Sequence, residues 1–175
     1  MKTIVRYGFI LGLVCILAAG FLAAVNSLAQ PKIFAQAKLQ EEKSLFEVLP
    51  EAARFEAVKS AAGEIIYYQA YNKDNTPAGV AFRAIGRGYS SDIETMAGMD
   101  TFGEITVIKV LSHNETPGLG SRITDSSFSS QFSGRNISGL NSVQAITGAT
   151  ISSHAVINSV KNKAEKVQSL LKNGK

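Results

Sequence analysis

The chain has 175 residues, of which 45% are hydrophobic, a composition that suits one modest domain with an appendage. Beyond Gln30 it carries 16 basic and 14 acidic residues, and the basic ones are scattered, so nucleic acid is excluded as an expected partner. A single cysteine, Cys15, and only two histidines exclude an internal disulfide and a thiolate or haem centre, so redox chemistry would need an organic cofactor or a partner protein.

The N-terminal segment predicts a membrane anchor over residues 1–30. It contains an uncharged apolar stretch, Tyr7–Val25, that is 19 residues long. A membrane-spanning helix needs about 20 apolar residues, whereas the apolar region of a cleaved signal peptide has about 7–15. A retained anchor is therefore favoured, and the cleavage-like stretch Ser27–Ala29 keeps a signal peptide as the alternative. The short basic head indicates a single-pass protein of the cell (inner) membrane, with the soluble part on the extracytoplasmic side.

Residues 31–50 predict a helical stalk that carries the soluble domain away from the membrane. Apolar side chains such as Leu45 and Val48 recur on one face, and Pro50 follows the expected end of the helix. Residues 51–175 then form the extracytoplasmic domain.

Two pairs of strands are predicted next. Residues 64–89 contain two runs rich in Ile, Tyr, Val and Phe around the turn-rich stretch 72–79, which indicates a β-hairpin. Residues 92–100 and 104–114 predict a second pair. In the last of these strands, simple alternation places Ile105, Val107, Lys109 and Leu111 on one face and Ile108 and Val110 on the other. Because both faces are mostly apolar, we expect this strand to be covered on both sides.

The stretch 115–148 is rich in Gly, Ser, Asn and Thr, and within it only residues 126–132 suggest a short helix. A polar stretch of this length inside a domain is usually functional or disordered. Apolar residues then recur at helical spacing over 152–172. The fold class is therefore α+β: one N-terminal transmembrane helix, followed by a small antiparallel sheet with flanking helices.

Small and hydroxyl-bearing residues gather at the start of the last predicted helix, in the stretch QAITGATISS, Gln144–Ser153. A helix N-terminus presents unpaired N–H groups and a partial positive charge, so it binds phosphate well. Gly148 and Ala149 would let a bulky group approach the backbone. The alternative is structural, since Thr147, Ser152 or Ser153 could simply cap the helix.

The stretch AITGATISS resembles the attachment motif of FMN-binding domains in the G subunit of Rnf-type complexes and the C subunit of sodium-pumping NADH:quinone reductases. The resemblance implies that a flavin transferase takes FMN from FAD and joins its phosphate to the hydroxyl of Thr150, with Thr147, Gly148 and Ala149 as small neighbours around the cofactor. Gln144 stands where the family usually has an acidic residue.

A second stretch, HNETPGLGSRI, His113–Ile123, is similar to the segment that lines the flavin in the same family. The resemblance implies further cofactor-binding residues here: Glu115, Thr116, Gly118 and Leu119. Arg135 stands where the family often has a Gly-Lys pair, so it is either a cation near the flavin or a solvated surface residue. Gly88 and Tyr89 are expected to be structural.

The implied function is electron relay through FMN, with no complete active site in this chain alone. The single anchor and the short domain are more similar to the Rnf G subunit, whose complex couples ferredoxin:NAD+ oxidoreduction to Na+ or H+ translocation. The expected partners are the other membrane subunits, the flavin transferase and the membrane. Three alternatives remain: the quinone-reductase C subunit, a stand-alone extracytoplasmic flavoprotein, and an anchored binding module without redox chemistry.

Overall fold

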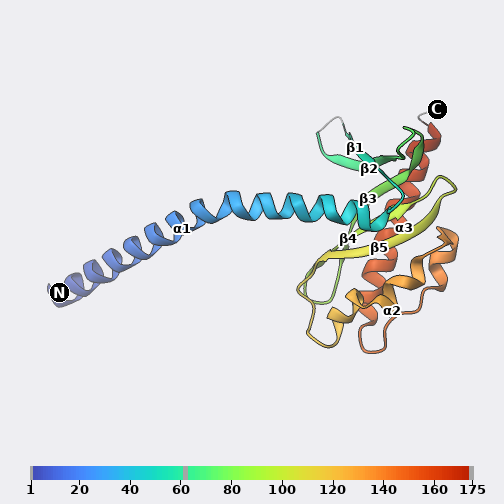
Figure 1. The fold of residues 1–175 in the computed structure, drawn as a ribbon. Coiled ribbons are helices and arrows are strands. Elements are labelled where there is room, and N and C mark those ends of the chain that lie inside the picture. Colours follow the sequence, from blue (N-terminus) through green and yellow to red (C-terminus); the bar gives the residue numbers. More distant parts are fainter. Residues whose placement is uncertain (1, 61–62, 174–175) are drawn as a thin grey trace. The chain divides into compact units, whose positions relative to one another are not determined.

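The computed structural model describes residues 2–60 and 63–173. Its elements follow the order α1, β1 to β5, a run of short helical turns that includes α2 and β6, and finally α3 (Figure 1). The chain divides into two compact units, Met1–Glu41 and Glu42–Lys175.

Helix α1, Lys2–Val48, continues without interruption through the predicted anchor and most of the predicted stalk. Pro31 lies inside it, and because proline has no N–H, this turn of the helix lacks one backbone hydrogen bond. Large apolar side chains of the first unit, such as Phe9 and Phe21, are exposed. In the described chain this is the one helix long and apolar enough to cross a membrane, with a mean hydropathy of 2.6 over its most apolar stretch.

Within the described residues, six antiparallel strands form one sheet in the order β1-β2-β3-β4-β5-β6. Their bounds are β1 Arg54–Lys59, β2 Ile65–Tyr71, β3 Pro77–Arg87, β4 Asp92–Met99, β5 Glu104–Ser112 and β6 Arg135–Asn136. Both predicted pairs are confirmed, since β2 pairs with β3 and β4 with β5. The sequence did not predict β1 or β6, because β1 is an edge strand with mostly exposed side chains and β6 has only two residues.

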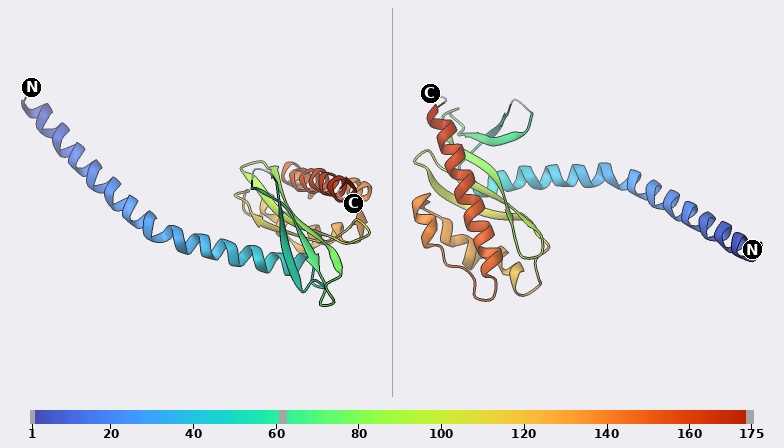
Figure 2. Two further views of the ribbon diagram at one scale, coloured as in Figure 1. Left: turned by 90° about the horizontal axis from the view of Figure 1, so that it is seen from above. Right: turned by 180° about the vertical axis from the view of Figure 1, so that it is seen from behind.

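Two hydrophobic cores cover the two faces of the sheet. Helix α3, Thr150–Asn173, packs on one face (Figure 2), and the last turns of α1, from Glu42 onward, pack on the other. The α3-side core includes Phe82, Ile93, Ile105, Phe128, Phe132, Leu140, Val156 and Val160. The α1-side core consists of Leu45, Val48, Leu49, Ala52, Ala70, Ala81 and Met96. The prediction that β5 is covered on both sides is therefore confirmed.

One predicted face assignment in β5 is wrong. Ile105 lies in the α3-side core together with Ile108, whereas Val107 and Leu111 pack against the α1-side core. The register between β4 and β5 shifts in the stretch from Ala97 to Met99. An irregularity of this kind inserts a residue into the ladder and reverses the simple alternation, so Ile105 changes face.

The segment between β5 and α3 contains a series of short helical turns. Their bounds are η1 Gly120–Thr124, α2 Ser126–Ser129, η2 Ser130–Phe132 and η3 Ser138–Ser142. Phe128 and Phe132 are fully buried, and their rings meet edge to face with centroids 5.4 Å apart. This pair anchors the short helix predicted over residues 126–132, which is confirmed.

Thr95 on β4 allows a test of what a buried hydroxyl without a hydrogen-bond partner costs in stability. Its hydroxyl oxygen is fully buried and has no hydrogen-bond partner among the described residues. Thr95→Val replaces that hydroxyl by a methyl group of similar size, so we expect the free energy of unfolding to rise by about 1 kcal/mol. Thr106→Val is the matched control, since the Thr106 hydroxyl donates to the Val48 carbonyl and its loss should be destabilising. Equal effects in thermal unfolding of the detergent-solubilised chain would contradict this expectation.

Candidate cofactor site

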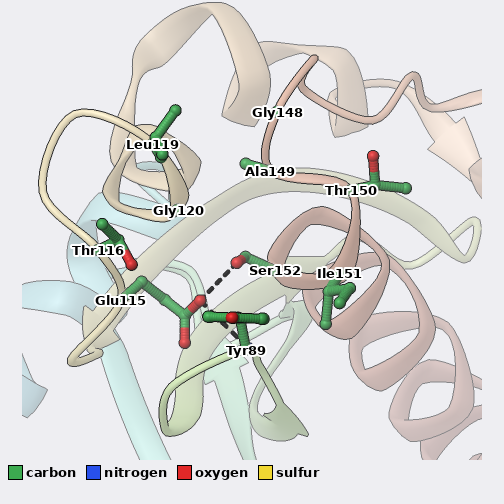
Figure 3. A pocket seen from close by; sticks show the side chains of 10 residues that line it. All are labelled: Tyr89, Glu115, Thr116, Leu119, Gly120, Gly148, Ala149, Thr150, Ile151 and Ser152. Atoms are coloured by element: carbon green, nitrogen blue, oxygen red, sulfur yellow. Dashed lines mark hydrogen bonds between the residues drawn. The ribbon is translucent and has the colours of Figure 1, made fainter.

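A cavity of about 510 Å³ opens at the start of α3. Three segments far apart in the sequence line it (Figure 3): the β3–β4 turn with Tyr89, the segment after β5 with Glu115, Thr116, Leu119 and Gly120, and the stretch from Gly148 to Ser152. Its volume lies within the range of about 300–1,000 Å³ that is typical of small-molecule sites. Apolar side chains at its rim remain accessible, since Tyr89, Leu119 and Ile151 are 70%, 50% and 56% exposed.

Helix α3 begins at Thr150, slightly before the predicted start at Ser152. Its first backbone hydrogen bond runs from the Ser153 N–H to the Ala149 carbonyl, at 2.9 Å. The N–H groups that precede Ser153 in the helix have no acceptor within it, and the helix dipole favours a negative charge beside them. Gly148, with φ at +82°, adopts the left-handed conformation that glycine favours and so turns the chain into the helix. This arrangement suits a phosphate group at the exposed Thr150.

The two serines of the first turn hold this segment in place. Ser153 is buried; its hydroxyl accepts a hydrogen bond from the Ile146 N–H at 3.0 Å and donates one to the Ala149 carbonyl at 2.8 Å. Ser152 is also buried and donates to the Glu115 carboxylate. Both hydroxyls therefore fix the stretch before the helix and its first turn, while the Thr150 side chain lies apart from that of Ser152 in Figure 3.

Close packing on the sheet fixes the position of α3. A Cβ atom added at Gly86 of β3 would lie 2.3 Å from the Ala155 carbonyl oxygen and 3.1 Å from the Ser159 Cβ. Only glycine therefore lets the backbone of α3 approach β3 this closely. The helix start, and with it one wall of the cavity, depends on this contact.

Glu115 joins the three segments of the site. Glu115 is 5% exposed, and its carboxylate accepts hydrogen bonds from the N–H groups of Tyr89, Ser90 and Ser91, at 3.0 to 3.2 Å, and from the Ser152 hydroxyl. Burial alone would raise the pKa of Glu115. The Ser152 hydroxyl and the three N–H groups outweigh that effect, so the pKa of this carboxyl lies below its ordinary value of 4.5.

This depressed pKa predicts how stability depends on pH. The ionised carboxylate contributes stability that is present above the ordinary pKa of 4.5 and is lost as the pH falls through the lower pKa of the folded state. We therefore expect the free energy of unfolding to decrease on acidification below pH 4.5. Denaturant titrations of the native chain and of Glu115→Gln measure this, and an equally steep acid loss in both would contradict the assignment to Glu115.

Comparisons with known proteins match both parts of the chain. The FMN-binding domain family matches residues 88–165, and the RnfG N-terminal region matches residues 1–48. The G subunit of the ion-translocating oxidoreductase complex of Yersinia pestis is 34% identical, in an alignment that covers 97% of this chain and 93% of that protein.

The chain belongs to the family of G subunits of ion-translocating oxidoreductase complexes.

A second member of this family, the G subunit of the proton-translocating ferredoxin:NAD(+) oxidoreductase complex of Clostridium ljungdahlii, is 32% identical over 90% of this chain and 88% of its own length. Among solved structures, NqrC of Shewanella oneidensis matches with a TM-score of 0.50 at 17% identity, covering 71% of this chain and 75% of that one. This second likeness concerns the fold alone. It agrees with the predicted α+β architecture, which the structure confirms.

In this G subunit, the site residues expected from the sequence fall into two groups. Those that line the cavity are Glu115, Thr116, Leu119, Gly148, Ala149 and Thr150. The lining formed by the described residues does not include Gly118, Thr147 or Arg135. Arg135 lies on β6, where its guanidinium donates to the Gln131 carbonyl and the Ser142 hydroxyl.

Four residues of the lining were not among the expected site residues: Tyr89, Gly120, Ile151 and Ser152. Tyr89 was expected to be structural, yet its side chain is exposed beside the cavity. The one sequence feature that could have indicated a role in the site was that Tyr89 is an aromatic residue within a polar turn. Gly120 faces Glu115 so closely that a Cβ there would lie 2.8 Å from the Glu115 Cβ. This contact depends on tertiary packing, so the sequence alone could not predict it.

The family and the apolar helix together support membrane anchoring of this G subunit. The N-terminal region matched by the family includes the apolar part of α1, which is long enough to span a bilayer. The chain is therefore anchored in a membrane by its N-terminal helix.

Proposed function

We propose that this chain is the electron-carrying G subunit of a membrane-bound, Rnf-type complex that couples ferredoxin:NAD+ oxidoreduction to Na+ or H+ translocation. It would relay electrons through one FMN joined by a phosphodiester bond to Thr150. The observation that carries the proposal is the exposed hydroxyl of Thr150, the first residue of α3, at the rim of a cavity within the FMN-binding domain. The names of the relatives from Yersinia pestis and Clostridium ljungdahlii support the type of complex.

The residues at the cavity fit an FMN group in three respects. The volume of about 510 Å³ is within the usual range for ligand sites, about 300–1,000 Å³. The start of α3 offers N–H groups and a positive dipole end to a phosphate. Tyr89, Leu119 and Ile151 offer apolar surface to a flat ring system.

Each part of the chain has a defined task in this proposal. Within the transferase, the Thr150 oxygen would replace AMP on the flavin-side phosphorus of FAD, and the hydroxyl proton would leave with AMP. The N–H groups of the first helical turn would then stabilise the negative charge of the diester. Gly148 and Ala149 leave the approach to Thr150 open. When bound, FMN supplies the one-electron chemistry that the side chains of this chain lack.

We further propose that the domain lies on the extracytoplasmic side, with residues 1–30 as the anchor, 31–50 as the stalk and 51–175 as the FMN-binding domain. The last turns of the stalk, from Glu42, pack into the compact unit of the domain. A reporter enzyme active only outside the cytoplasm, fused after residue 175, tests the side. Activity of the fusion supports the proposal, and an inactive but stably produced fusion contradicts it.

Intact-protein mass spectrometry of the native chain, purified from cells that contain the transferase, tests the attachment. The expected mass exceeds that of the chain by one FMN less one water molecule. A chain of unmodified mass that is colourless would favour an anchored binding module without redox chemistry. A chain of unmodified mass that releases FMN on denaturation would refute the covalent bond and retain the flavoprotein assignment.

A further inference from the structure

The cavity wall contains one buried negative charge, that of Glu115. No ion pair joins this carboxylate to a basic side chain among the described residues. The part of the lining that the structure describes also contains no lysine or arginine. Any group bound in the cavity therefore meets a carboxylate that no cationic side chain of the described residues neutralises, and a charge in a site partly shielded from water acts more strongly than one in bulk solvent.

The hydrogen bonds of Glu115 leave it little capacity to contact a ligand directly. An ionised carboxylate has about four lone-pair positions and can only accept hydrogen bonds. Four donors from the chain already point at its two oxygens: the N–H groups of Tyr89, Ser90 and Ser91 and the hydroxyl of Ser152. Glu115 therefore acts on an occupant of the cavity through its charge rather than through a hydrogen bond.

Two glycines show that the site is built around this carboxylate. A Cβ at Gly88 would lie 2.5 Å from its Oε1 atom, and a Cβ at Gly120 would lie 2.9 Å from its Oε2 atom. The β3–β4 turn thus closes on one oxygen and the segment after β5 on the other. The carboxylate is fixed in position, so its electrostatic effect is also fixed.

We propose that Glu115 sets the reduction potential of the flavin: its carboxylate, held by four donors in the cavity wall, is a permanent negative charge that disfavours the addition of an electron to the group bound there. The inference rests on the proposed function. Adding an electron to the flavin brings a second negative charge close to the first, and their repulsion lowers the potential. Removal of the carboxylate charge should therefore make the flavin easier to reduce.

The test is a spectroelectrochemical titration of the flavin-loaded, full-length chain in detergent. For Glu115→Gln, which keeps the shape and removes the charge, we expect the equilibrium constant for one-electron reduction to rise about tenfold, or about 59 mV in midpoint potential. Glu56→Gln is the matched control, because it removes the same charge from an exposed side chain of β1 that does not belong to the described cavity lining. Its potential should stay close to that of the native chain.

Two results would overturn the inference: a native potential in loaded Glu115→Gln, or a shift in Glu56→Gln as large as that in Glu115→Gln. If Glu115→Gln does not fold or load, the exposed neighbour Thr116 decides the question. Thr116→Lys should raise the potential and Thr116→Glu should lower it; identical potentials in both would show that charge in this wall is not felt. A native chain that carries no flavin would refute the proposed function itself, which is a separate outcome.

Discussion

The full-length chain with Thr150→Ala is expected to carry no covalently bound flavin. Thr150 is exposed at the start of α3 and at the rim of the cavity, and alanine has no oxygen to form the phosphodiester bond. Flavin fluorescence under ultraviolet light in a denaturing gel should fall from that of the native chain to background. Because the side chain of Thr150 is exposed, the change in unfolding free energy should stay within about 0.5 kcal/mol.

Two further variants control this experiment. Thr147→Ala removes the other threonine of the motif, which does not belong to the cavity lining, and should keep its fluorescence. Thr150→Ser restores a hydroxyl and should recover part of the signal. A fluorescent band in Thr150→Ala together with its loss in Thr147→Ala would move the attachment to Thr147.

The second large effect is expected from Gly86→Ala. The added Cβ would lie 2.3 Å from the Ala155 carbonyl oxygen. Because this oxygen belongs to the backbone, the clash can be relieved only if α3 moves away from β3. Overpacking of this kind costs up to about 3 kcal/mol, so we expect a loss near that upper value in thermal or chemical unfolding. Since α3 carries one wall of the cavity, flavin loading should fall as well.

Arg87→Ala is the neighbouring control for this variant. Its guanidinium is largely exposed, and its ion pair with Asp92 at 3.3 Å lies at the surface, where such pairs contribute little. We expect its unfolding free energy to stay within about 0.5 kcal/mol of the native value. A comparable destabilisation in both variants would mean that the strand end, rather than the contact with α3, is the sensitive feature.

Much of the fold could be predicted from the sequence because its signals are local. The hairpin of β2 and β3 follows from apolar runs around a turn-rich stretch, and α3 follows from its helical period. The edge strand β1 was missed because its short run is mostly exposed, and only Phe55 packs partly against the α1-side core. Ile105 was placed on the wrong face because a register shift between two strands leaves no trace in one of them.

The candidate site was predictable only where a motif carried it. The stretch around Thr150 and the segment after β5 do meet at one cavity, as the motifs suggested. The part played by the β3–β4 turn was not predictable. Three consecutive N–H groups converge on a glutamate more than twenty positions along the chain, and only tertiary packing brings them together. Backbone donors have no side-chain signature, so sequence patterns cannot show them.

The open rim of the cavity has a consequence for how tightly it must hold its occupant. Leu119 and Ile151 remain half exposed there, so a flat ring system bound beside them would bury less of its surface than in an enclosed site. The proposed bond to the adjoining Thr150 would make every return to the cavity an intramolecular event, with an effective concentration on the order of millimolar. Weak non-covalent binding would then be sufficient, and the ring could leave the cavity briefly without diffusing away from the protein.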